Sequence, residues 1–332
     1  MQELVRTNNA VLITAIEALL KGAEIPHMVL DQYMSVLEGS LGILPRRILV
    51  DDEHQSAARR LLADAGLAHE LRPLPPGQQD DVTDDAVMGG RLRLMQKKRG
   101  HRVGHDAILL AAATAAQPGD RAADLGSGVG AAGLALAIRV SAVRVTLVER
   151  DPELAGIAAE NIARNGLDGR ADAVTLDVAA ASDAFAAVGL GPGSMDRVLM
   201  NPPFNSPALN VSPDPARRAA HAAGDGDLPH WVQAAAWLLH SAGTLTLIWR
   251  ADGLAQVLAA LEPAFGGVAV RPVYGRAGQP AIRILVSAAK GGRAPLMLLP
   301  GFELNDLSGR PTAAAEDVLR HGKALDLTGA SG

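Results

Sequence analysis

The spacing of apolar and polar residues predicts two regions of different architecture. In the first region, the apolar residues 12, 16, 19 and 20 share one face of a predicted helix. A second helix is predicted to end at Gly66, a typical C-terminal stop. The order strand, helix, strand, strand, helix predicts a small α+β (βαββα) domain over residues 1–70. These elements are predicted at 3–7, 10–21, 26–30, 47–50 and 54–65.

From Val87 onward, short apolar runs alternate with helical patterns. Strands are predicted at 121–125, 143–148, 173–176, 197–200, 244–249, 268–274 and 282–286. Helices are predicted at 131–138, from Asp151-Pro152 to Asn165-Gly166, at 228–240 and at 251–262. Regular alternation of this kind predicts an α/β fold, with a mostly parallel seven-stranded sheet and helices on both faces.

A segment rich in proline and acidic residues separates the two regions. It reads RPLPPGQQDDVTDD over residues 72–85, which is typical of a linker. The predicted organisation is therefore a domain at 1–70, a linker at 71–86 and a second domain at 87–332. A length of 332 residues, with 48% hydrophobic and 20% charged residues, supports two folded cores rather than disorder.

Composition excludes several classes of site. The chain has no cysteine, which excludes disulfides, cysteine-bound zinc and thiol nucleophiles. The histidines lack the spacing of metal ligands, so no metal is expected. The N-terminus does not resemble a signal peptide and no apolar run is long enough to span a membrane, so we expect a cytoplasmic protein. The net charge of −5 means that any contact with nucleic acid must come from local basic patches.

A glycine-rich turn joins the first strand of the second domain to its helix. It reads Asp124-Leu-Gly-Ser-Gly-Val-Gly130, and Gly126 and Gly128 would let the backbone approach a ligand closely. The pattern Gly126-x-Gly128-x-x-Ala131 also matches a dinucleotide fingerprint. A tight turn without a ligand remains an alternative at this point.

Carboxylates stand at three successive strand ends and favour a cofactor site. Asp124 precedes the glycines and could accept a hydrogen bond from a cationic amine, directly or through water. Glu149 could accept from both hydroxyls of a ribose, and Asp177 from an adenine amine. Together they fit S-adenosylmethionine, although solvated loop acids would show the same pattern.

The motifs together resemble a known enzyme family. Asp124–Gly130, Val148-Glu-Arg-Asp-Pro152 and Asn201-Pro-Pro-Phe204 resemble those of the Rossmann-like class I methyltransferases that use S-adenosylmethionine to modify amino groups. Residues 87–300 resemble most closely the bacterial tRNA(Val) (adenine-37-N6)-methyltransferases. The segments that carry the closer match are Met88–Leu92, Gln96–Ala111 and Arg283–Arg293. Residues 1–70 resemble a small domain family named for signal transduction.

The stretch Asn201-Pro-Pro-Phe204 contains groups that could assist the transfer of a methyl group to an exocyclic amine. Such an amine is a weak nucleophile because its lone pair is delocalised into the ring. The Asn201 side-chain oxygen and the Pro202 carbonyl can accept its two hydrogens and turn the lone pair toward the methyl group. Phe204 offers a face on which a flipped-out base can stack. The alternative is a strand terminator followed by a core aromatic.

Two basic stretches are candidates for substrate binding. Residues 91–102 contain six Lys or Arg and no acid, including Lys97, Lys98, Arg99 and Arg102, and could follow a phosphate backbone. A solvated hairpin, or a segment closing over the cofactor, would look the same. The long segment 205–227 carries Arg217 and Arg218 and is interpreted as a substrate-facing flap or a surface insertion.

The leading hypothesis is therefore methylation of adenine N6 in structured RNA, most simply tRNA. A glutamine amide in a protein is the nearest alternative, because enzymes of that class share the Asn-Pro-Pro-aromatic motif. The basic stretch favours RNA, whereas the negative net charge favours a protein substrate. An NAD-dependent oxidoreductase would leave Asn201–Phe204 without a role, and a non-enzymatic sensor would leave all the motifs without one.

Overall fold

The computed structural model describes residues 2–7, 9–23, 25–30, 46–51, 54–72, 82–98, 103–203 and 228–329. The chain divides into two compact units, Met1–Asp81 and Val82–Gly332. Each unit has its own hydrophobic core, and each is described by itself.

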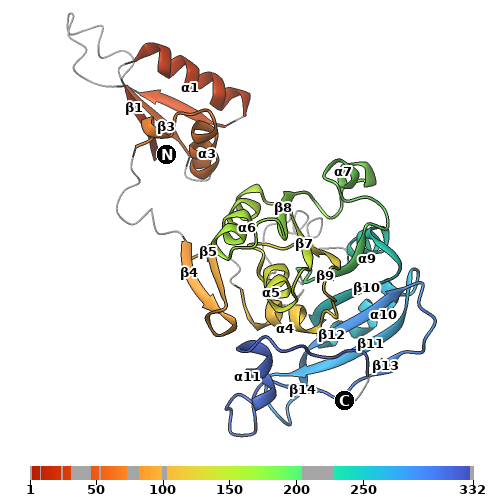
Figure 1. The fold of residues 1–332 in the computed structure, drawn as a ribbon. Coiled ribbons are helices and arrows are strands. Elements are labelled where there is room, and N and C mark those ends of the chain that lie inside the picture. The colour runs from red at the N-terminus through yellow and green to blue at the C-terminus, as the bar shows by residue number, and fades with distance from the viewer. Residues whose placement is uncertain are drawn as a thin grey trace, which may run out of the picture. The chain divides into compact units, whose positions relative to one another are not determined.

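In its described residues, the first unit is a three-stranded antiparallel sheet with the α-helices α1 and α3 (Figure 1). Its strands lie in the order β1-β3-β2, and Leu4, Ile48 and Val50 from this sheet pack against Ile16 and other apolar residues of the helices. The predicted α+β domain is confirmed. Its elements are β1 (Gln2–Thr7), α1 (Ala10–Gly22), β2 (His27–Leu30), β3 (Arg46–Val50), α3 (Gln55–Asp64) and the 3-10 helix η2 (Ala68–Glu70).

The structure describes the two ends of the segment predicted as a linker. Leu71 forms a bridge with Val5, so the chain is still part of the first unit there. The strand β4 (Val82–Val87) pairs with β5 (Leu92–Lys97), and the short helix η3 (Met88–Gly90) turns the chain between them. Residues 82–86 therefore lie in a strand, in which the exposed Asp84 pairs with Arg93 of β5 and the half-buried Asp85 accepts a hydrogen bond from Gln96 of β5. Residues 73–81 lie outside the described residues.

The second unit is built around one large sheet. Its strands follow the order β13-β11-β12-β10-β9-β6-β7-β8, and β14 pairs with β11. The pairs β6–β7, β7–β8, β6–β9 and β9–β10 are parallel, whereas β12 runs antiparallel to β10 and β11. All seven predicted strands are present, with two short ones added. The bounds are β6 (Arg121–Leu125), β7 (Arg144–Glu149), β8 (Ala171–Thr175), β9 (Met195–Met200), β10 (Leu239–Arg250), β11 (Phe265–Tyr274), β12 (Ala281–Lys290), β13 (Met297–Leu298) and β14 (Phe302–Glu303).

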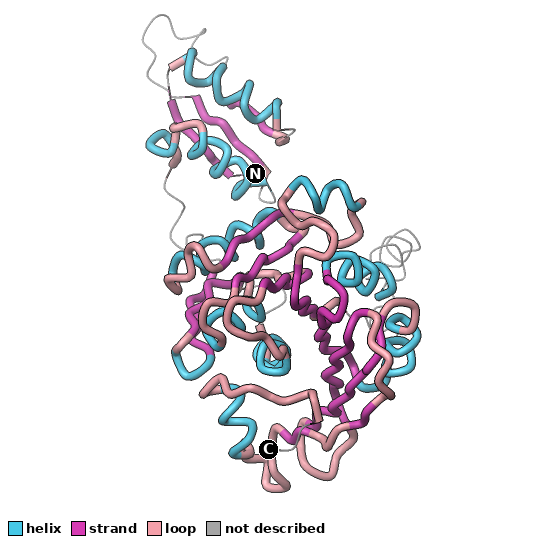
Figure 2. The backbone as a smooth tube through the Cα atoms, turned by 45° about the vertical axis from the view of Figure 1, so that its right-hand side comes forward, coloured by secondary structure: helices cyan, strands magenta, loops and turns pink. Residues whose placement is uncertain are grey.

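Helices cover both faces of this sheet (Figure 2). Alternate residues of β6 face opposite cores, with Ala122 in one and Ala123 in the other. This is the pattern of a Rossmann-like sheet buried on both sides. The first face carries α4 (His105–Ala113), α5 (Ala131–Arg139), α6 (Pro152–Arg164) and α11 (Ala313–Leu319). The second carries α7 (Ser182–Ala187), α9 (Leu228–Leu238) and α10 (Leu254–Leu261), which follows the short η4 (Ala251–Gly253).

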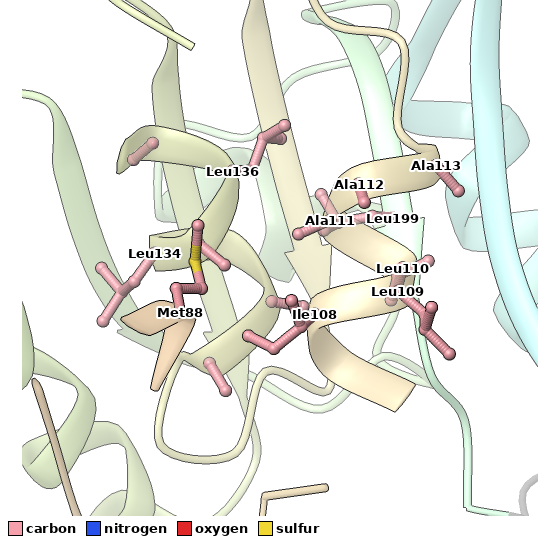
Figure 3. Close-up of a cluster of buried hydrophobic side chains, with 14 of the residues drawn as sticks. Met88, Ile108, Leu109, Leu110, Ala111, Ala112, Ala113, Leu134, Leu136 and Leu199 are labelled. Atoms are coloured by element: carbon pink, nitrogen blue, oxygen red, sulfur yellow. The ribbon is translucent and has the colours of Figure 1, made fainter. Parts of the chain in front are cut away.

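Helix α4 was not predicted, and its burial explains why. All six residues from Ile108 to Ala113 are buried (Figure 3). A helix that is apolar on every side has no 3.6-residue pattern to detect. By contrast, α6 was predicted well: Asp151 caps it by accepting hydrogen bonds from the Glu153 and Leu154 amides, and Pro152 occupies its first turn. Within the described residues, no helix is long and apolar enough to cross a membrane.

Candidate active site

The candidate site lies where the strand order reverses, at the carboxyl edge of the large sheet. Strand β6 lies between β7 and β9, and Leu125 pairs with Val148 on one side and with Met200 on the other. The residues that follow these three therefore lie side by side: Gly126, Glu149 and Asn201. Ligands of open α/β sheets bind at such a reversal.

Glu149 holds the glycine turn in place. One carboxylate oxygen accepts from the Gly128 amide at 2.8 Å and the other from the Asp151 amide at 2.9 Å. The side chain is only 8% exposed. Each oxygen keeps a second lone pair, so the predicted contact with two ribose hydroxyls remains chemically possible. The turn and the acid thus form one preorganised unit.

Asp124 is a buried carboxyl group under the same turn. It is 2% exposed, and its Oδ2 accepts from the Gly133 amide at 2.8 Å. Burial raises the pKa of Asp124 to about 7; the Gly133 hydrogen bond opposes this increase and the charge of Glu149 adds to it. A methyl group at position 133 would press against Leu147, at 2.4 Å, so the close approach of α5 to the sheet requires glycine there.

Asp177 lies at the same edge but differs in its environment. It follows β8, is exposed, and accepts a hydrogen bond from the Ala179 amide at 2.8 Å. The Leu176 amide donates to the Glu149 carbonyl, so the two acidic loops are directly joined. The role predicted for Asp177, recognition of an adenine amine, stays a prediction.

Asn201 presents an unsatisfied acceptor in the site. Its Oδ1 is buried and has no hydrogen-bond partner in the described part of the chain. A buried acceptor left unpaired costs about 1–3 kcal/mol. Pro202 beside it is buried, which fixes the position of its backbone carbonyl. Phe204 lies outside the described residues, as do Arg217 and Arg218.

The hairpin β4–β5 is fastened to the glycine turn by a residue that sequence reasoning missed. Asn161 on α6 is fully buried; its Oδ1 accepts from the Met95 amide at 2.7 Å, and its Nδ2 donates to the carbonyls of Met95 and Val129. Val129 belongs to the glycine turn. Asn165, one helical turn after Asn161, also binds the hairpin. Two asparagines at this spacing in the sequence could have indicated that this face of the helix holds another segment.

The basic stretch is partly engaged in ion pairs. Lys97 lies 2.6 Å from Glu153, Arg93 lies 2.6 Å from Asp84, and Arg91 donates to the His321 carbonyl. Lys98 is exposed. Arg99 and Arg102 lie outside the described residues. The hairpin interpretation thus holds over residues 92–97, and phosphate binding by this stretch stays a prediction.

Gln96 and Asp106 belong to the segments that resemble the tRNA methyltransferases, and both side chains bind other parts of the domain. Gln96 is buried; it donates to Asp85 at 2.6 Å and accepts from the Val103 amide at 2.9 Å. Asp106, in the first turn of α4, pairs with Arg283 of β12 at 2.9 Å. These contacts place the start of α4 at the same edge of the sheet as Asn201.

No group of three or more potential metal ligands occurs among the residues that the structure describes.

Comparison with known proteins names the family. The family "Methyltransferase small domain" matches residues 101–272, more than half of the chain. The chain belongs to that methyltransferase family. The resemblance proposed from the motifs is thereby confirmed, and an NAD-dependent oxidoreductase is no longer a candidate. Residues 1–66 match a second family, described as "Putative prokaryotic signal transducing protein".

Relatives of this methyltransferase differ in the acceptor that their names specify. A tRNA1(Val) (adenine(37)-N6)-methyltransferase of Bacteroides fragilis is 31% identical over 151 residues, 46% of this chain and 61% of that protein. A protein-L-isoaspartate O-methyltransferase of Aeropyrum pernix is 32% identical over 143 residues, 43% of this chain and 44% of that protein. The chain thus spans less than two thirds of these curated relatives.

A solved structure of a methyltransferase also matches this chain. It is a predicted O-methyltransferase from Agrobacterium tumefaciens, 31% identical, with a TM-score of 0.57 over 67% of this chain and 98% of that chain. It supports the fold of the methyltransferase domain and, together with the family match, the use of a methyl donor.

Proposed function

We propose that this chain transfers a methyl group from S-adenosylmethionine to an exocyclic amine, with adenine N6 of a tRNA as the substrate. The observation that carries the proposal is the buried Oδ1 of Asn201 beside the glycine turn, which has no hydrogen-bond partner among the described residues. An amine donates hydrogen bonds, so a substrate amine would satisfy this acceptor. A substrate hydroxyl or carboxylate would need a base to remove its proton or a donor to hold its charge.

The residues at the carboxyl edge fit the proposed cofactor. Gly126 and Gly128 have positive φ angles of 65° and 56°, and open space at the side-chain position of Gly128 leaves its backbone accessible to a ligand. Glu149 retains lone pairs for ribose hydroxyls, and Asp124 supplies a carboxyl group that ionises readily when a cation approaches. When bound, S-adenosylmethionine supplies an electrophilic methyl group on a positively charged sulfur.

The protein contributes orientation and charge stabilisation rather than a general base. Asn201 Oδ1 and the Pro202 carbonyl would accept the two amine hydrogens and direct the nitrogen lone pair. These hydrogen bonds strengthen as the nitrogen becomes positive, so they stabilise the transition state more than the bound substrate. The rigid prolines hold the carbonyl in place between turnovers. After the methyl group is transferred, the cationic amine would lose one proton to solvent water.

The choice of tRNA rests on the Bacteroides relative and on the basic stretch. The relative's name specifies adenine N6, which has the chemistry that Asn201 suits. One observation favours a second candidate, a glutamine amide in a protein: Arg93 and Lys97 already have carboxylate partners, which leaves less charge for phosphates. Both substrates present an NH2 group to the same acceptors.

The test compares the wild-type protein with Asn201→Ala. Both are incubated with labelled S-adenosylmethionine and with RNA or protein from cells that lack this gene product, followed by nucleoside analysis. We expect N6-methyladenosine in tRNA, and a loss of about 10²–10³ in kcat for the variant, by analogy with removal of one oxyanion-hole donor. Cofactor affinity should change little. Full activity of the variant would refute the role of Asn201, and label in protein alone would favour the glutamine substrate.

A further inference from the structure

The indole of Trp231 lies directly against the glycine turn. Trp231 is in the first turn of α9, and a Cβ atom placed on Gly126 would come within 2.3 Å of its Cη2 and 2.8 Å of its Cζ3. No side chain larger than hydrogen fits at position 126. Glycine is therefore required there for the ring as well as for the φ angle of 65°.

The position of this ring within the site follows from the sheet register. Leu125 pairs with Met200, so Gly126 and Asn201 are neighbours at the carboxyl edge. Gly126 also lies beside Glu149, but helix α9, which carries Trp231, packs on β9 and β10. The ring that rests on Gly126 therefore lies on the β9 side of β6. Trp231 is only partly buried, and it packs against the second core without being enclosed by it.

The proposed reaction places the sulfonium of the cofactor on this same side of β6. The transferable methyl group has to reach an amine held by Asn201. The predicted adenine partner, Asp177, follows β8, which is two strands away from β6. A cofactor that spans this edge would have its adenine toward β8 and its sulfur near Gly126, within reach of the indole.

We propose that Trp231 is a cofactor-binding residue whose indole contacts the positively charged sulfonium of S-adenosylmethionine. The face of an indole attracts cations more strongly than that of any other aromatic side chain. The product, S-adenosylhomocysteine, has no charge on sulfur. Trp231 thus favours the substrate form of the cofactor over the product form and assists product release. This inference rests on the proposed use of S-adenosylmethionine.

Calorimetry on the full chain tests whether the contribution of Trp231 to binding depends on the positive charge of the sulfur. Dissociation constants for S-adenosylmethionine and S-adenosylhomocysteine are measured for the wild type, Trp231→Leu and Trp231→Phe. We expect Trp231→Leu to weaken S-adenosylmethionine about tenfold and S-adenosylhomocysteine no more than about threefold, with Trp231→Phe between it and the wild type. Trp237→Phe is the matched control: the same helix carries Trp237, whose ring pairs with Phe185 at 5.7 Å.

Fluorescence gives a second readout that does not depend on the leucine variant folding. Ligand binding to the wild type should change tryptophan emission more for S-adenosylmethionine than for S-adenosylhomocysteine. This change should disappear in Trp231→Phe and persist in Trp237→Phe. Equal weakening of both ligands, or no weakening, would overturn the inference and make Trp231 a packing residue only. If the wild type binds neither ligand, the proposed function itself fails.

Discussion

Replacement of Asp124 by asparagine should stabilise the protein at alkaline pH. Burial raises the pKa of Asp124 from 3.8 to about 7. Between about pH 4 and pH 7 the folded state therefore binds more protons at this site than the unfolded state, and the free energy of unfolding falls as pH rises through this window. Above pH 7 the carboxylate is ionised in both states, and the full cost of burying its charge is subtracted from the free energy of unfolding. A shift of about three pKa units corresponds to roughly 4 kcal/mol, at 1.36 kcal/mol per unit.

An asparagine keeps an oxygen for the Gly133 amide but carries no charge. Because its NH2 group needs a partner, we expect a gain of about 2–3 kcal/mol at pH 8 rather than the full amount. For a unit of about this size, that gain raises the Tm by roughly 4–12 °C. The gain should shrink toward zero at pH 5, where the wild-type carboxyl is protonated in the folded state.

Thermal unfolding at pH 5, 6, 7 and 8 measures this difference. Asp172→Asn is the control, because it removes one charge from an exposed position on β8. A difference between Asp124→Asn and wild type that does not vary with pH would refute the reasoning, as would a less stable variant at pH 8. If Asp124 serves a cationic cofactor, the variant should also lose the stabilisation that S-adenosylmethionine adds to the wild type at pH 8.

Three further predictions concern cofactor, domains and substrate. Glu149→Gln should weaken binding of S-adenosylhomocysteine at least tenfold in calorimetry, because its NH2 group would oppose the Gly128 or Asp151 amide; unchanged affinity would contradict the assignment. A chain of residues 82–332 should fold and bind cofactor as the full chain does; an insoluble product would mean that the first unit supports the second. Neutralising Lys97, Lys98 and Arg99 should raise KM for RNA and flatten its salt dependence without changing cofactor affinity, and an unchanged salt slope would exclude these residues from RNA binding.

The local pattern was sufficient for much of the fold. Seven apolar runs became the seven main strands because strands buried on both faces leave nearly continuous hydrophobic stretches. Caps such as Asp151-Pro152 located a helix start to the residue. The pattern failed for α4, which has no polar face, and for β4, whose adjacent acids Asp84 and Asp85 resembled a linker.

For the site, the sequence by itself determined the candidate groups: Asp124, Glu149 and Asn201 lie at or beside the carboxyl ends of their strands, and parallel strands bring such ends to one edge. It also determined the family, because the motifs at these positions are local. Only the tertiary structure decided which groups are free to act. The partners of Lys97, Asn161 and Trp231 come from segments that are distant in sequence, at Glu153, Val129 and Gly126. Burial of Asp124, and of an Asn201 oxygen without a partner in the described segments, are likewise consequences of packing, which no spacing along the chain encodes.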